Sequence, residues 1–196
     1  PELYNVYVSF NNEDEYKVRF GFREVKFRKD GFYLNGKKIK IRGLNRHQSY
    51  PYVGYAMPEN VQKADADLLK YKLGVNLVRT SHYPNSVHFL NRCDEIGLLV
   101  FTEMPSWQFL GEGEWRDICL DNVRRMVLRD RNHACVFMWS LGNEASFGQA
   151  FFAGASYIKK RDNRNNKDIH YKDNDAQYVN NSCAHINIFK NFTQNL

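Results

Sequence analysis

A short apolar run in this sequence ends in an amide and a carboxyl group, within the six residues Trp139-Ser140-Leu141-Gly142-Asn143-Glu144. A carboxyl group that follows a buried strand is partly removed from water, and burial favours the protonated form of an acid. A protonated carboxyl can donate a proton to a leaving oxygen as a general acid. Glu144 is therefore a candidate acid/base, and a structural role, capping the next helix or pairing with Arg79, stays open.

Polar side chains follow three other apolar runs in the same way. They are Asn45, Arg46 and His47 after the first run, Arg79, Ser81 and His82 at the second, and Glu103 after the third. His47 and His82 could instead be core histidines with satisfied nitrogens, and Glu103 could orient a neighbour rather than react. Trp107 could be a stacking platform for a ring or a packed loop residue. Asn143 could hydrogen-bond a ligand hydroxyl.

The elements that carry these residues follow a repeated strand–loop–helix rhythm. Strands are expected at residues 39–44, 75–81, 98–102 and 135–141, and helices at 60–71, 84–96, 115–130 and 149–161. The helix at 60–71 has Val61, Ala64, Leu68 and Tyr71 on roughly one face. The helix at 115–130 has Ile118, Val123, Met126 and Val127 as its apolar residues. Helices between short strands imply parallel pairing through crossovers. This pattern predicts the N-terminal half of a (β/α)₈ TIM barrel, whose active site lies at the C-terminal strand ends.

A doubly wound sheet is the alternative architecture, and the absence of a glycine-rich phosphate loop after the first strand weakens it. Only four or five units are present, so the barrel is not expected to close. Residues 169–171 could begin a fifth strand, and the asparagine-rich tail from about residue 162 is expected to be poorly ordered or to begin the missing half.

The first 29 residues have the alternation of β-strands, with a hairpin expected from residues 3–10 and 16–20. The turn signals Asp30-Gly31 and Asn35-Gly36 bracket a further short strand at residues 32–34. We expect residues 1–29 to be the end of a β-sandwich and residues 30–196 to be a partial barrel domain.

The bulk composition excludes several classes of protein. The net charge is +6, but the basic residues are scattered and mixed with acidic ones, which favours solvated helix faces over a nucleic-acid partner. The four cysteines have no metal-ligand spacing. Cys93, Cys119 and Cys135 stand in apolar contexts and are expected as small core residues in a reducing compartment. The sequence has neither an apolar run of 18 residues nor a signal peptide, so a cytoplasmic location without membrane contact is expected.

Several longer motifs resemble glycoside hydrolase family 2, and most closely its β-galactosidases. The motifs are Gly21–Val25, Asn35–Lys37, Ile41–His47, Val78–Asn85, Cys93–Leu98, Arg129–His133 and Trp139–Glu144. The resemblance runs from residue 1 to about 161. It implies hydrolysis of terminal non-reducing β-D-galactosides with retention of configuration. The strands at the N-terminus would then be the last of an immunoglobulin-like domain.

The resemblance also implies roles for individual residues. Glu144 matches the family's general acid/base, and Asn143 matches the neighbour that holds the 2-hydroxyl of the sugar. His47 and His82 match histidines that contact the galactosyl unit. Arg79, Glu103 and Trp107 complete the set of candidate substrate-binding residues.

The sequence departs from the family pattern in two ways. The nucleophilic glutamate is expected on a later strand, beyond residue 196, so the isolated chain is expected to be inactive. Many relatives bind Mg²⁺ through the acid/base, a glutamate and a histidine after the third strand, but here that loop reads Met-Pro-Ser-Trp-Gln-Phe from residue 104 to 109. No cofactor is therefore certain. The family makes Mg²⁺ possible, but the positions of its ligands are not matched here.

Two alternatives to a β-galactosidase stay open on the sequence. One is a β-glucuronidase or β-mannosidase of the same family, since substrate choice depends largely on loops outside this chain. The other is a non-catalytic remnant or weak sugar-binding fragment. Full-length relatives are often homo-oligomers, which adds a second expected kind of partner besides the sugar.

Overall fold

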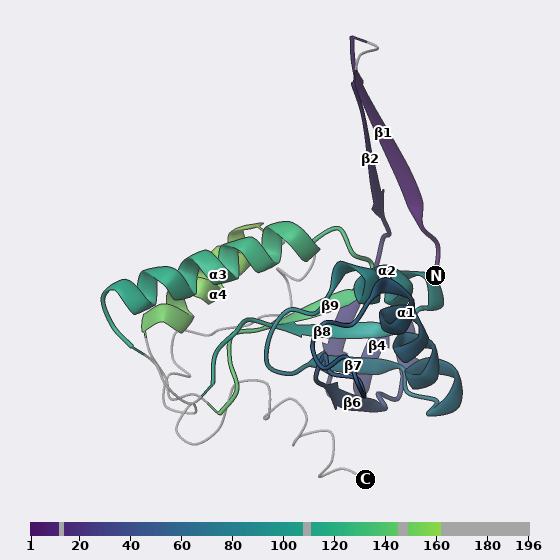
Figure 1. The fold of residues 1–196 in the computed structure, drawn as a ribbon. Coiled ribbons are helices and arrows are strands. Elements are labelled where there is room, and N and C mark those ends of the chain that lie inside the picture. The colour runs from purple at the N-terminus through teal and green to yellow at the C-terminus, as the bar shows by residue number, and fades with distance from the viewer. Residues whose placement is uncertain (12–13, 108–110, 145–148, 162–196) are drawn as a thin grey trace.

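The computed structural model describes residues 1–11, 14–107, 111–144 and 149–161 (Figure 1). The possible fifth strand at residues 169–171 and the asparagine-rich tail lie outside the described residues, as does Cys183.

A four-stranded parallel sheet forms the centre of the molecule. Its strands are β6 (Gly43–Arg46), β7 (Leu77–Thr80), β8 (Leu99–Glu103) and β9 (Val136–Ser140), hydrogen-bonded in that order. The crossovers contain α1 (Glu59–Asp67) with a π-helical turn (Leu68–Lys72), α2 (Val87–Ile96) and α3 (Glu114–Asp130), and α4 (Gln149–Arg161) follows β9. The α/β class and the partial barrel predicted from the sequence are confirmed.

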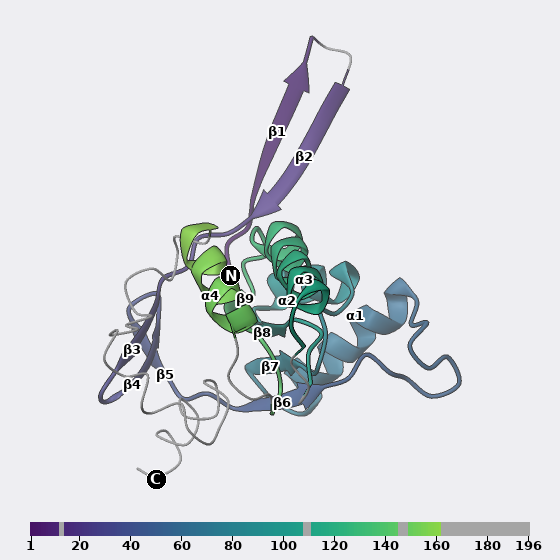
Figure 2. The same cartoon turned by 90° about the vertical axis from the view of Figure 1, so that its left-hand side faces the viewer.

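The two faces of this sheet are covered by different layers (Figures 1 and 2). Val78, Val100 and Val136 pack on the side of α1 and α2, in a cluster that includes Phe89 and Leu90. The opposite face is covered by a three-stranded antiparallel sheet of β3 (Val25–Arg28), β4 (Gly31–Leu34) and β5 (Lys37–Ile39). Leu77, Leu99, Phe101 and Phe137 pack there against Val25 and Phe32.

Alternation along the strands places polar residues above this second apolar layer. Successive strand residues point to opposite faces, so Arg79 lies on the same face as Leu77, and Glu103 on the same face as Leu99 and Phe101. The β3–β5 sheet therefore closes the N-terminal end of this face, and the C-terminal end is left for polar side chains.

The remaining strands, β1 (Tyr4–Phe10) and β2 (Asp14–Phe20), form an antiparallel hairpin that projects from the body of the molecule (Figures 1 and 2). All seven residues of β1 are exposed. At the base of the hairpin, Arg19 donates to Glu95 of α2 at 2.9 Å and to the Asn91 carbonyl oxygen at 3.0 Å. The hairpin predicted from the sequence is therefore present, and these contacts connect it to the second helix.

Two features of the predicted elements are wrong. The strand predicted at residues 39–44 is divided, because Ile39 ends β5 in the covering sheet and β6 begins only at Gly43. The apolar face predicted for the helix at 60–71 is also wrong. That helix buries Gln62, Ala66 and Leu69, whereas Leu68 and Tyr71 are exposed. The physical reason is Arg46, whose buried guanidinium donates to Gln62 at 2.9 Å and draws this side chain inward.

Of the other predicted elements, α4 has the predicted bounds, and several others have shorter or shifted ends. The helix predicted from Pro84 begins at Val87, because the Ser86 side chain accepts from the His88 N–H as an N-cap at 3.2 Å. It ends at Ile96, and the Gly97 that follows has a φ of +66°, a left-handed conformation that glycine adopts without a steric cost. On α3, Val123, Met126 and Val127 are buried as expected, but Ile118 is exposed and Cys119 is buried in its place.

The β3–β5 sheet spans the boundary that the sequence placed between residues 29 and 30. β3 precedes this boundary, but it pairs with β4, and Val25 packs against the parallel sheet. The division into an immunoglobulin-like end and a barrel stays a proposal.

Cys93, Cys119 and Cys135 are buried free thiols, as expected for core residues. Burial raises the pKa of Cys93 and of Cys135, so both are neutral small side chains of the core. Among the helices that the structure describes, none has the length and apolar composition that a membrane span requires.

Candidate active site

Glu103 is the centre of a polar network at the C-terminal ends of β7, β8 and β9. Its side chain has no exposed surface. It accepts hydrogen bonds from Arg79 Nε at 2.8 Å and from Ser140 Oγ at 2.6 Å, and its other oxygen lies 2.6 Å from His82 Nδ1. One carboxylate therefore connects three neighbouring strand ends, and its burial is balanced by a guanidinium and two further donors.

This network fixes the hydrogen-bonding state of His82. A carboxylate can only accept, so the hydrogen between Glu103 and the imidazole is carried on Nδ1. In the neutral ring, Nε2 is then an acceptor. Glu103 thus orients His82, which agrees with the orienting role considered for it from the sequence.

Arg79 orients the amide of Asn143 in the same way. Arg79 Nη2 donates to Asn143 Oδ1 at 2.9 Å, so the carbonyl oxygen of the amide faces the guanidinium. The other terminal atom, Nδ2, can only donate. Arg79 pairs with Glu103 and Asn143, the residue before Glu144, rather than forming the Arg79–Glu144 pair considered from the sequence.

Glu144 lies at the edge of this cluster and is exposed, so the partial burial expected from the sequence is wrong. The strand ends at Ser140, and three residues separate Glu144 from this buried end of β9. The φ of Glu144 is +48°, a left-handed conformation that is uncommon for residues other than glycine. Its Oε2 accepts a hydrogen bond from the Trp107 indole Nε1 at 3.2 Å.

Trp107 connects Glu144 to His82. The indole and imidazole ring centroids are 5.6 Å apart, with the planes tilted by 34°. The tryptophan is 60% exposed, so it is a loop residue on the surface of the site and not a packed core residue. Trp107 and Asn143 also form an isolated parallel β-bridge, which includes the bond from Asn143 N–H to Ser106 O at 3.1 Å.

The residues after β6 divide between the site and the core. His47 is exposed, and its ring lies 5.3 Å from that of His82, centroid to centroid, so the structure brings the two candidate histidines together. Arg46 is buried instead, with Nε 2.6 Å from Asp65 and the guanidinium 3.9 Å over the Phe89 ring. Ser81 is also buried, and Asn45 is exposed.

Two residues near the site, Ser140 and Tyr83, were not predicted as site residues from the sequence. Ser140 donates to Glu103, and it stands inside the Trp139–Glu144 motif. Tyr83 lies beside His47, with ring centroids 6.2 Å apart, and its hydroxyl accepts from the Gln48 N–H at 3.0 Å. The signal for both was their place directly at a strand end or next to a candidate histidine.

The described part of the loop after β8 does not fit a Mg²⁺ site shared with Glu144. Mg²⁺ prefers carboxylate and other oxygen ligands. Residues 104–107 bring methionine, proline, serine and tryptophan, and the Trp107 indole N–H is a donor directed at the Glu144 carboxyl.

A second polar cluster, Asp94, His133 and Cys135, lies away from these strand ends. Asp94 accepts from the Cys135 N–H at 2.8 Å and lies 2.7 Å from His133 Nδ1, while Arg19 stands 3.8 Å from the same carboxylate. Both oxygens are already in use, and the nearby guanidinium opposes a cation. This cluster connects α2 to the start of β9.

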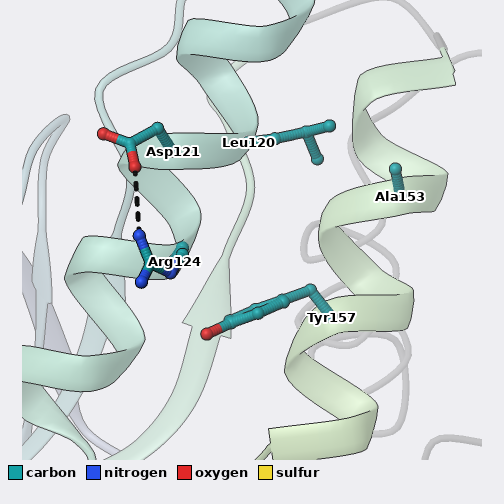
Figure 3. A pocket seen from close by; sticks show the side chains of 5 residues that line it. All are labelled: Leu120, Asp121, Arg124, Ala153 and Tyr157. Atoms are coloured by element: carbon teal, nitrogen blue, oxygen red, sulfur yellow. Dashed lines mark ion pairs between the residues drawn. The ribbon is translucent and has the colours of Figure 1, made fainter.

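A pocket of about 360 Å³ lies between α3 and α4 (Figure 3). Leu120, Asp121 and Arg124 of α3 and Ala153 and Tyr157 of α4 line it, and Asp121 and Arg124 form an ion pair at 3.7 Å. It contains none of the candidate site residues, so it is separate from the cluster around Glu103.

Comparison with known proteins places this arrangement in a family. The family model described as glycosyl hydrolases family 2, TIM barrel domain, matches residues 25–195. The β-galactosidase of Thermoanaerobacterium thermosulfurigenes is 54% identical over 162 residues, which cover 81% of this chain and 23% of that protein. The β-galactosidase of Thermoanaerobacter pseudethanolicus is 58% identical over 146 residues, covering 72% and 20%. The chain thus spans less than a quarter of the length of these curated relatives.

Solved structures agree on the fold. The β-glucuronidase of Parabacteroides merdae aligns with a TM-score of 0.70 and 32% identity, covering 85% of this chain and 22% of that one. A family 2 β-galacturonidase from Eisenbergiella tayi bound to galacturonate aligns with a TM-score of 0.71 and 31% identity, covering 82% and 30%. The matched barrel domain, the relatives and the strand-end cluster lead to one conclusion: this chain belongs to glycoside hydrolase family 2 and carries part of its TIM barrel domain.

Proposed function

We propose that this part of the barrel supplies the general acid/base, Glu144, for hydrolysis of terminal β-D-galactosides with retention of configuration. The observation that carries the proposal is the convergence of Glu144, Asn143 and His82 at adjacent strand ends around Glu103. The site lies where barrel enzymes place their chemistry. The exposed carboxyl of Glu144 is accessible to a substrate oxygen.

The oriented groups suit a sugar with several hydroxyls. His82 offers an acceptor at Nε2, and Asn143 offers a donor at Nδ2, so one group can accept from a hydroxyl and the other can donate to one. Glu144 would protonate the glycosidic oxygen as the bond to the anomeric carbon breaks. In the second step its carboxylate would remove a proton from the attacking water.

The second carboxylate of a retaining mechanism must come from outside the described residues. It would lie about 5–5.5 Å from Glu144 and attack the anomeric carbon. Glu103 does not suit this role, because its carboxylate is buried and holds Arg79, His82 and Ser140. We therefore expect the isolated chain to show no β-galactosidase activity.

The choice of a galactoside rests on the relatives. Two proteins named β-galactosidase are 54% and 58% identical to this chain. A β-glucuronidase is the second candidate, because the β-glucuronidase of P. merdae shares the fold at 32% identity. We also propose a cytoplasmic location and homo-oligomer formation, as expected from the resemblance to this family.

A chimera tests the proposed function. This chain would replace its aligned segment in the T. thermosulfurigenes β-galactosidase, the relative that is 54% identical over 162 residues. We expect the chimera to hydrolyse phenyl β-D-galactoside, and this activity tests the acid/base role, because the parent enzyme supplies the other loops that govern substrate choice. Glu144→Gln should lower kcat/KM for the galactoside by roughly 10²–10⁴-fold, because the proton donor is lost.

The controls separate folding from chemistry. The parent enzyme shows that the assay works, and Glu114→Gln changes an exposed glutamate of α3 outside the site. A folded chimera that is inactive on phenyl β-D-galactoside would contradict the proposal. Full activity of Glu144→Gln would remove Glu144 from the acid/base role.

A further inference from the structure

The loop after β8 and the acid/base corner after β9 contact each other through both backbone and side chains. Trp107 and Asn143 form a parallel β-bridge, with Asn143 N–H donating to Ser106 O at 3.1 Å. One residue further along, the Trp107 indole N–H donates to Glu144 Oε2 at 3.2 Å. The tryptophan is thereby fixed relative to the backbone that carries the carboxyl.

The indole is also supported on its other side. Its ring lies 5.6 Å from the His82 ring, and His82 is held by the buried Glu103 at 2.6 Å. The support for Trp107 therefore extends down to the Glu103 network at the ends of β7, β8 and β9. An exposed side chain supported in this way can restrain another exposed side chain.

Two features of Glu144 indicate that its orientation depends on such a contact. Its carboxyl is exposed, and its backbone has a left-handed φ of +48°. A strained backbone conformation at a site persists because surrounding contacts determine it. An exposed glutamate side chain otherwise has several rotatable bonds, and an acid that transfers a proton must be held in one orientation.

The chemistry of the donor then distinguishes the two carboxyl oxygens. An indole N–H can donate but cannot accept, so the Glu144 oxygen that it contacts must be an acceptor. In the protonated acid, the carbonyl oxygen is a better acceptor than the hydroxyl oxygen, so this contact favours the hydrogen on the other oxygen, Oε1. We propose that Trp107 is a positioning residue for Glu144, whose indole N–H holds Oε2 so that Oε1 carries the transferable proton. This inference rests on the proposed role of Glu144 as the acid/base.

The kinetic test uses the chimera and a series of aryl β-D-galactosides. Trp107→Phe keeps an aromatic ring but removes the N–H. Phenyl galactoside needs protonation of its leaving oxygen, whereas 2,4-dinitrophenyl galactoside hardly does. We expect Trp107→Phe to lower kcat/KM for the phenyl substrate by roughly 10–10²-fold, as misplacement of a catalytic group does, with little change for the dinitrophenyl substrate and in KM.

Two further variants separate positioning from stacking. Trp115→Phe makes the same replacement at a tryptophan that packs against the core cluster of α3 and α4. It should leave kcat/KM unchanged for both substrates. Trp107→Ala removes both the ring and the N–H. If Trp107 is only a platform for the sugar, Trp107→Phe retains activity on both substrates. Trp107→Ala then raises KM by the same factor for both substrates. This pair of results would overturn the proposal.

A measurement without turnover tests the hydrogen bond on the chain itself. The chain has three tryptophans, so its ¹⁵N-labelled indole groups give three signals, and the one that is lost in Trp107→Phe belongs to Trp107. Glu144→Gln replaces a carboxylate acceptor by a weaker amide, and the Trp107 indole proton should move upfield while the other two stay in place. An unchanged Trp107 signal would overturn the proposal. An inactive chimera with a shifted signal would count against the proposed function alone.

Discussion

At the scale of single residues, Glu103 is a buried charge that orients the side chains of the site without itself being exposed. Its carboxylate holds Arg79, His82 and Ser140, and through Arg79 it also determines the direction of the Asn143 amide. The sequence placed Glu103 among candidate substrate-binding residues. The structure places it beneath the residues that face outward, because its side chain has no exposed surface.

Replacing Glu103 with glutamine should destabilise the fold strongly. The change leaves the Arg79 guanidinium, whose side chain is 12% exposed, without its counter-charge. Breaking a buried pair by removing one partner costs about 3–5 kcal/mol. Denaturant unfolding would measure this cost. Glu95→Gln is the matched control, because exposed pairs contribute about 0–1 kcal/mol, and equal effects for the two variants would contradict the expected difference.

At the scale of elements, the sequence predicted the types of most helices and strands but not all of their partners. Periodicity identifies α2 and α3 because most of their buried residues are apolar. It fails for α1, where the buried Gln62 is selected by Arg46, a residue of another element. The contact from Trp107 to Glu144 joins two loops 37 residues apart, and no local pattern encodes it.

Gln62→Leu tests the corrected face of α1. Leucine would satisfy an apolar pattern, but it cannot accept the hydrogen bond that Arg46 donates at 2.9 Å. Leaving a buried donor without this acceptor should cost about 1–3 kcal/mol. Lys63→Ala, one residue along the same helix, removes an exposed pair with Glu59 and should cost less than about 0.5 kcal/mol. Thermal melts of the two variants would compare these costs, and a more stable Gln62→Leu would contradict the role of Arg46.

The contact between the hairpin and α2 should weaken in acid. Burial alone would raise the pKa of Glu95, but hydrogen bonds from Arg19 and Arg92 outweigh it and lower that pKa. A lowered pKa in the folded state means stability that is present above the unfolded value of about 4.3 and lost as pH falls through the folded value. Below about pH 4.3, the wild-type melting temperature should therefore fall more steeply than that of Glu95→Gln. Parallel curves would show that Glu95 does not contribute.

At the scale of the whole molecule, the described chain exposes surfaces that folded proteins usually cover. β6 and β9 are the edge strands of the described parallel sheet. The projecting hairpin exposes large apolar side chains, with Phe10 and Tyr16 each 70% accessible. Free edges and contiguous apolar surface favour association between copies.

Polar substitutions on the hairpin should therefore improve the behaviour of the isolated chain. Phe10→Ser together with Tyr16→Ser removes exposed apolar surface without touching the core, so light scattering should report less association at an unchanged melting temperature. Ile118→Ser is the control, since this exposed side chain lies on α3, away from the hairpin. Equal improvement from the control would indicate that general hydrophobicity, and not the hairpin, causes association.

Azide rescue of the chimera carrying Glu144→Ala tests most directly that Glu144 is the acid/base of a retaining site. With 2,4-dinitrophenyl β-D-galactoside the sugar can still be transferred to the enzyme nucleophile, because this leaving group needs no proton. Azide then attacks the anomeric carbon without a general base and displaces the nucleophilic carboxylate. The predicted result is turnover that rises with azide and yields β-galactosyl azide. Turnover that is unaffected by azide, or a variant that hydrolyses phenyl galactoside as fast as the unmodified chimera, would contradict the assignment.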